Sequence, residues 1–495
     1  MSRMLPPGAS LRYLKTDTKD CLKAHKQGST SVCRLLRNLP RFSQATDQQI
    51  LSSKVTLQEV QFALARDYGY RSWTELVSHI ESQRRPSEVA TATTGRALLP
   101  NAGSFENSDS TLSHLRSIRY VLEYHGEAVD WDWLMGVSGE AFCYYFHPVG
   151  TYLTQHVHSW DVANAALEAH GYAGRWTTPA FTNDVAELLA PFRTEIAKGN
   201  PVIAPGIVPH LDGIHSRCDH WYTVVGVDMA AGKVIVAGHG QDLSETVLPT
   251  GDAGPDGPHP CWYGIIRTFA PGSNGHYGPD RPLFVTRRTG QPRARAVVAA
   301  DAVKQGVALA KEESTCAIAG WGRGTYLAGH KALRALRDTV AKAEGDGLAE
   351  FQNRNPTGEE PFRGFADELE FLRLLSDRRR SAAGFLEQAR ELWQDAESRR
   401  LSSAAEHFRQ SSREALAAFN VRYGNLEEHD RVKRMSAEAS AQDAGNPVWN
   451  AYWARADAAL ADKQKRQEMV AHLDQVLKHE SAAVAEIESV LPSLR

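Results

Sequence analysis

The chain has 495 residues, of which 42% are hydrophobic and 23% charged, a composition that excludes disordered, collagen-like and disulfide-stapled proteins. Its net charge of −3 argues against nucleic-acid binding by the chain as a whole. No apolar run is long enough to span a bilayer, and the first residues lack the apolar core of a signal peptide. With six scattered cysteines, we expect a cytoplasmic protein of several domains that has free thiols and requires no cofactor.

Residues 1–82 are expected to form a small helical module. Apolar residues recur at helical spacing after Ser10 and again within 29–38. The segments TLQE (56–59) and SWTE (72–75) are capping boxes, each followed by an apolar stripe. The pattern predicts four short helices around one core.

The same segment resembles a helical module found in bacteria, often ahead of ankyrin repeats. The matching residues are LKTDTKDCLKAHKQGS (14–29), LRNLPRF (36–42) and VTLQEVQFALARDYGYRSWTELVSHI (55–80). That module has no assigned chemistry, and its basic residues are interpreted as a solvated face. Residues 83–108 lack periodicity and are interpreted as a linker.

Residues 109–290 have a mixed α+β character. A helix is expected to begin near Ser110 or Thr111 and to end at Gly126. Further helices are expected at 159–170 and 182–198, and strands at 201–208, 221–227, 233–237, 261–269 and 282–286. The Gly/Pro/Asp-rich residues 238–280 are expected to form a long loop region, where functional residues commonly lie.

Residues 291–495 are expected to form a helical bundle or hairpin without strands. Helical Ala/Leu/Glu/Arg-rich stretches cover 293–313, 326–345, 364–424 and 448–491. The three arginines at 378–380 are interpreted as part of a solvated face. The bundle is expected to offer a surface for a partner, including a second copy of the chain.

Three segments resemble the N-terminal domain of the butirosin-biosynthesis acyltransferase (BtrH-like) family. They are SHLRSIRYVLEYHG (113–126), LMGVSGEAFCYYF (134–146) and HWYTVVGVD (220–228). Residues 293–340 and HESAAVAEIESVL (479–491) resemble the helical extension of uncharacterised relatives. The resemblance implies a papain-like cysteine-peptidase fold, with a mostly antiparallel sheet, and transfer of an acyl group from a carrier protein to an amine.

This resemblance also implies a site. His220, at the mouth of a strand, matches the general base, and the nucleophilic cysteine falls at Ser113, so the expected thiol is absent. A serine can serve as the nucleophile, or Ser113 only decorates the first helical turn. Asn107 matches an oxyanion-hole amide, and Asp242 or His239 is expected to orient His220.

Other residues near these segments are candidates for substrate contact. They are Ser138, Tyr144, Tyr145, Trp221 and His239, although the core of a mixed domain explains the aromatic residues equally well. Cys143 is either a second candidate nucleophile or a small buried hydrophobic residue.

A rival hypothesis comes from the histidines, most of which lie in 109–290. His156 and His158 have the spacing that directs two imidazoles to one side of a strand. His215 and Cys218 lie close to His220 in sequence and are further candidate ligands, although no known zinc spacing is matched.

Three functions therefore remain open. The first is an acyl-transfer or amide- or thioester-cleaving enzyme in specialised metabolism, acting on a small-molecule or carrier-bound acyl substrate. The second is a non-catalytic ligand- or partner-binding protein on the same fold, and the third is a histidine-ligated metal enzyme. No membrane or nucleic-acid partner is expected.

Overall fold

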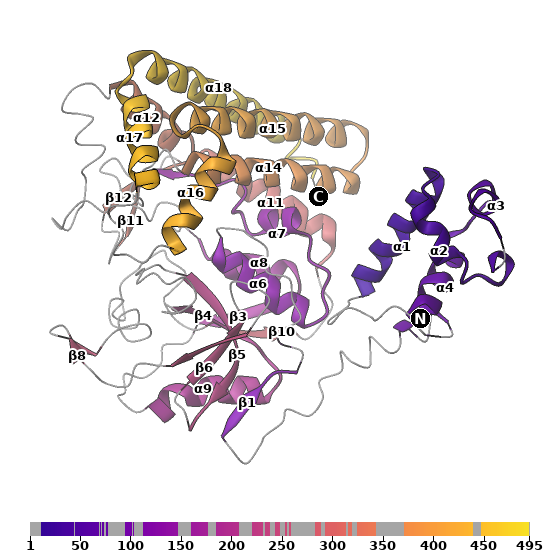
Figure 1. Cartoon of the computed structure of the whole chain (residues 1–495). Coiled ribbons are helices and arrows are strands. Elements are labelled where there is room, and N and C mark those ends of the chain that lie inside the picture. The colour runs from indigo at the N-terminus through magenta and orange to yellow at the C-terminus, as the bar shows by residue number, and fades with distance from the viewer. Residues whose placement is uncertain are drawn as a thin grey trace.

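The computed structural model shows an α+β protein in which helices predominate beside an antiparallel sheet (Figure 1). The structure describes residues 11–43, 45–68, 70, 72–73, 76–77, 95–100, 102, 112–146, 160–176, 185–206, 220–230, 233–237, 243–247, 253–254, 257–258, 283–288, 293–312, 315–318, 324–342, 371–438 and 447–494. Among these residues, no helix is long and apolar enough to cross a membrane.

The N-terminal module is helical, as predicted. Its helices are α1 (Leu11–Lys26), α2 (Cys33–Leu36), α3 (Asp47–Ser52) and α4 (Leu57–Asp67). Buried apolar residues of α2, α3 and α4 form one cluster, against which partly buried residues of α1 pack, and Leu14 of α1 joins residues of α4 in a second cluster. The capping box at Thr56 and Glu59 is confirmed. Helix α3, which has its own capping box at Thr46 and Gln49, was not predicted, and part of the box at 72–75 lies outside the described residues.

The main sheet has seven strands, all paired antiparallel. Their order is β3 (Tyr172–Trp176), β10 (Leu283–Arg287), β4 (Val202–Gly206), β5 (His220–Asp228), β6 (Lys233–Ala237) and β7 (Leu243–Val247), with β1 (Arg96–Leu98) paired to β5. The predicted strands at 201–208, 221–227, 233–237 and 282–286 are confirmed, whereas 261–269 lies outside the described residues.

Strands also form where none was predicted. Strand β1 lies within the expected linker, and β7 within the expected loop region. A second sheet joins β11 (Thr315–Ile318), β12 (Gly324–Ala328) and β2 (Tyr145–Phe146), and β8 (Ala253–Gly254) pairs with β9 (Gly257–Pro258). The expectation of no strand after residue 291 is therefore wrong. Pairing with the distant β2 overrides the helical pattern, so the helix expected at 326–345 begins only at Gly329.

Helices cover both faces of the main sheet. Helix α6 (Ser113–Tyr124) and helix α9 (Val185–Ala197) both contact β4 and β5. Ile203 packs with the apolar face of α6, whereas Val202 and Ala204 pack with α9. This alternation follows from the two-residue repeat of a strand. The neighbouring helices are α7 (Trp131–Val137) and α8 (Val162–Ala169).

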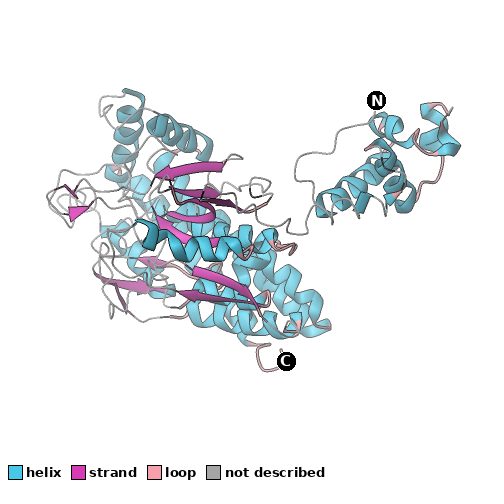
Figure 2. Cartoon of the chain, turned by 90° about the horizontal axis from the view of Figure 1, so that it is seen from below, coloured by secondary structure: helices cyan, strands magenta, loops and turns pink. Residues whose placement is uncertain are grey.

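The C-terminal half is a set of long helices that pack on one another, on α7 and on the second sheet (Figure 2). They are α11 (Arg295–Ala310), α12 (Gly329–Lys342), α14 (Phe371–Ala389), α15 (Asp395–Tyr423), α16 (Leu426–Glu438), α17 (Pro447–Ala461) and α18 (Lys463–Glu488). One hydrophobic core includes α6 and α7 together with α11, α14, α15 and α18. The core is therefore continuous across residue 290.

Helix α7 approaches α14 closely at Gly136. A Cβ atom at this position would overlap the ring of Phe385 on α14. We expect Gly136→Ala to lower the free energy of unfolding by about 1–3 kcal/mol through overpacking. Urea denaturation measures the effect, and the exposed Ser481→Ala on α18 is the control. Equal stability of the two variants would contradict this packing.

Candidate functional site

Helix α6 and strand β5 begin toward the same end of the sheet. The first evidence comes from contacts at the C-terminal end of α6. Just after α6, Glu127 accepts a hydrogen bond from the Tyr172 hydroxyl at 3.1 Å. An Arg287 nitrogen lies 3.6 Å from the same carboxylate. Tyr172 and Arg287 are paired at one end of the β3–β10 ladder. The C-terminal end of α6 therefore lies at this end of the sheet.

The register of the strands puts the start of β5 at the opposite end. Leu283 begins β10 and pairs with Ile203 of β4. From Ile203, β4 runs away from the Arg287 end to Gly206, which pairs with His220. Since α6 ends near Arg287, its first residue, Ser113, lies toward the end of the sheet at which His220 begins β5.

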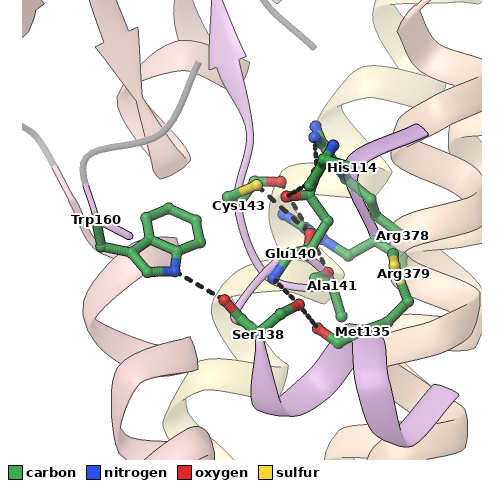
Figure 3. Close-up of polar contacts among 9 residues, drawn as sticks. All are labelled: His114, Met135, Ser138, Glu140, Ala141, Cys143, Trp160, Arg378 and Arg379. Atoms are coloured by element: carbon green, nitrogen blue, oxygen red, sulfur yellow. Dashed lines mark hydrogen bonds and ion pairs between the residues drawn. The ribbon is translucent and has the colours of Figure 1, made fainter. Parts of the chain in front are cut away.

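A second set of contacts connects the first turn of α6 to the end of the sheet at which β5 begins. Trp176, paired with Leu283 there, donates from its indole to Asp161 at 2.8 Å. The neighbouring Trp160 donates from Nε1 to the backbone oxygen of Ser138 at 2.7 Å. Glu140 lies two residues after Ser138. One of its carboxylate oxygens is 3.4 Å from Nε2 of His114, which is in the first turn of α6 (Figure 3).

The described residues include only part of the predicted catalytic set. For Ser113, His220 and Trp221 the structure describes the backbone and not the side chain. The candidates that lie outside the described residues are Asn107, Asp242, His239, His156, His158, His215 and Cys218. Their predicted roles stay predictions. Within the described ranges, no group of three or more His, Cys, Asp or Glu side chains could hold a metal ion.

The segment 138–143 forms a buried turn after α7. The Ser138 hydroxyl donates to the backbone oxygen of Met135 at 3.0 Å and accepts from the Glu140 amide at 3.2 Å. Gly139 supplies the left-handed conformation, with φ of 83°. The hydroxyl of Ser138 is therefore used to shape the turn (Figure 3).

Tyr144 and Tyr145, predicted to contact substrate, are both buried. The Tyr145 hydroxyl donates to Glu312 at 3.4 Å, and the backbone oxygen of Tyr144 accepts from the Gly329 amide at 2.9 Å. These two residues connect β2 to the C-terminal half, a role that the core interpretation of the aromatic residues anticipated.

Cys143 is buried, with 1% of its surface exposed. Its thiol lies 3.4 Å from the backbone oxygen of Glu140, to which it donates. Burial, which disfavours the thiolate, raises the pKa of Cys143 to about 12. The thiol is therefore protonated at neutral pH, which favours the interpretation of Cys143 as a small hydrophobic residue over a nucleophile.

The interpretation of the arginine run 378–380 as a solvated face is wrong for two of its three members. Arg378 is 2% exposed and Arg379 is 1% exposed, whereas the side chain of Arg380 is 73% exposed. The reason is the register of α14. Arg378 and Arg379 lie one turn after the buried Leu374 and Leu375 and so share the stripe of the helix that faces the core.

Both buried arginines are paired with buried glutamates. Arg378 donates from Nη2 to Glu140, which is fully buried. Arg379 donates from Nε to Glu480 of α18 at 2.6 Å and from Nη1 to the backbone oxygens of Ala141 and Cys143 at 2.8 and 3.2 Å. The charges compensate one another, and α14 thereby holds the 138–143 turn (Figure 3).

Comparison with known proteins does not assign the chain to a family. No protein-family model matches it, and no curated protein matches it. The resemblance to the butirosin-biosynthesis acyltransferases is therefore a hypothesis about this chain.

Because its thiol is buried and protonated, Cys143 is expected to resist iodoacetamide in the folded protein at pH 8. It should react fully in denaturant, where the pKa of a cysteine returns to about 8.5. Peptide mass spectrometry measures the labelling, and the partly exposed Cys21 is the internal control. Rapid labelling of Cys143 in the native state would contradict the buried geometry.

The pair of Arg378 and Glu140 is expected to matter far more for stability than Arg380. Arg378→Met leaves Glu140 buried without its ionic partner, so the free energy of unfolding should fall by about 3–5 kcal/mol. The double variant Glu140→Met/Arg378→Met removes both charges and should recover most of that loss.

Urea denaturation of the single and double variants measures both effects. Arg380→Met, two positions along α14, is the matched control and should change stability little, because Arg380 is exposed. A free energy of unfolding of Arg378→Met equal to that of Arg380→Met would contradict the burial of Arg378.

Proposed function

We propose that the chain is an acyl-transfer or amide- or thioester-cleaving enzyme with a papain-like arrangement, in which Ser113 replaces the usual cysteine. The observation behind the proposal is the common position of two element starts. Helix α6 begins at Ser113 toward the end of the sheet where β5 begins at His220, and α6 packs on β5. A nucleophile at a helix N-terminus and a base on a rigid strand are the parts that acyl transfer needs.

The proposed chemistry has two steps. The Ser113 hydroxyl attacks the acyl carbonyl while His220 takes its proton, and the leaving thiol or amine receives that proton as the bond to the acyl carbon breaks. An amine or water then attacks the acyl-serine, gives a proton to His220, and releases Ser113 as the free hydroxyl.

The helix supports the nucleophile in this scheme. Leu112 precedes Ser113 and has no polar side chain with which to cap the helix. The first-turn amides and the positive end of the helix dipole are proposed to stabilise the developing oxyanion. Asn107 is proposed to add a donor, and Asp242 or His239 to orient His220.

The substrate is proposed to be a small-molecule or carrier-bound acyl group. The resemblance to the BtrH-like family supports a carrier-protein thioester as donor and an amine as acceptor. The same resemblance is the reason for proposing a role in specialised metabolism.

Ser113→Ala is expected to abolish turnover on a panel of acyl thioesters and p-nitrophenyl esters, with a loss of about 10³-fold or more, because the attacking oxygen is removed. Intact-mass spectrometry should show one acyl adduct on the native chain and none on the variant. Ser117→Ala, one turn further along α6, is the matched control and should retain the adduct. An adduct that persists in Ser113→Ala would remove Ser113 from the mechanism.

A further inference from the structure

The turn next to the proposed site depends on charges supplied by the C-terminal helices. We define the buried charge cluster as His114, Glu140, Arg378, Arg379 and Glu480, each at most 6% exposed. Its members come from α6, the 138–143 turn, α14 and α18. The cluster thus joins segments that are more than two hundred residues apart in sequence (Figure 3).

Glu140 occupies the central position in this cluster. One of its oxygens accepts from Arg378, and the other faces Nε2 of His114 at 3.4 Å. His114 directly follows Ser113 and belongs to the same first turn of α6. A displacement of Glu140 is therefore passed on to the turn that presents residue 113.

We infer that Glu140 and Arg378 are positioning residues of the acyl-transfer site, an inference that rests on the function proposed above. Arg378 fixes Glu140, and Glu140 fixes His114 and with it the first turn of α6. The C-terminal helical half is then an integral part of the site and more than a surface for partners.

Orientation of the first turn has a chemical consequence. The amides of this turn and the helix dipole act on an anion at residue 113 only while the turn is ordered and aligned. A loosened turn weakens that stabilisation and leaves the anion more dependent on solvent.

A cysteine probe at residue 113 tests the inference without any substrate. In Ser113→Cys, the helix N-terminus should acidify the new thiol, and the pH dependence of its alkylation by iodoacetamide reports that acidity. Peptide mass spectrometry separates the label on residue 113 from that on the partly exposed Cys21 and the other cysteines, and Cys143 does not react because its thiol is buried. We expect Glu140→Met/Arg378→Met in this background to slow alkylation at pH 7 by about tenfold, with the pH midpoint moved upward.

Two further variants separate positioning from stability. Arg380→Met in the Ser113→Cys background should leave the alkylation profile unchanged. Glu140→Asp keeps the buried charge and withdraws the carboxylate from His114 by one methylene, and it should move the midpoint in the same direction as the double variant. It also provides the test should the double variant fail to fold.

The outcomes distinguish the two proposals. A midpoint unchanged by Glu140→Asp and by the double variant, whatever happens to the melting temperature, would overturn the positioning role. A shifted midpoint in the probe, together with no acyl adduct on the native Ser113 chain, would uphold positioning of the turn and reject the proposed acyl transfer.

Discussion

The burial of Arg378 against Glu140 is the constraint on which the rest of the structure depends. A guanidinium and a carboxylate that are both removed from water must meet each other, because either one alone is strongly destabilising. This requirement sets the position of α14 against the turn after α7. A second pair, Arg379 with Glu480, extends the same requirement to α18, so the antiparallel sheet and the long helices share one core.

The pair of Arg378 and Glu140 lies next to the first turn of α6, where the proposed nucleophile Ser113 is located. The turn that holds Glu140 also contacts His114, and α6 and β5 begin toward the same end of the sheet. A nucleophile at a helix start needs a helix that does not move, and buried ionic contacts with few alternative partners provide such rigidity. The chain therefore packs the antiparallel sheet against one side of α6 and places the buried pair of Arg378 and Glu140 next to its first turn.

Local patterns in the sequence predicted the elements that depend on local interactions. Strands β4, β5, β6 and β10 have β-branched or aromatic runs, with Gly or Pro next to β4, β6 and β10, and α6 has a clear apolar stripe. Strands β1 and β12 were missed because β1 pairs with β5 and β12 pairs with β2, both far away in sequence, and because their own residues give little signal. Strand β11 pairs with its neighbour β12 and was missed with it.

The arginine run shows the same limit for the candidate site. Its charges predicted exposure, yet the spacing from Leu374 and Leu375 already placed Arg378 and Arg379 on the apolar stripe of α14. A charge at a core position of an amphipathic helix indicates a buried partner, because the helix cannot turn that position to solvent without exposing its neighbours. The identity of the partner was not accessible in this way, since Glu140 lies in a turn more than two hundred residues upstream and only tertiary packing brings the two together.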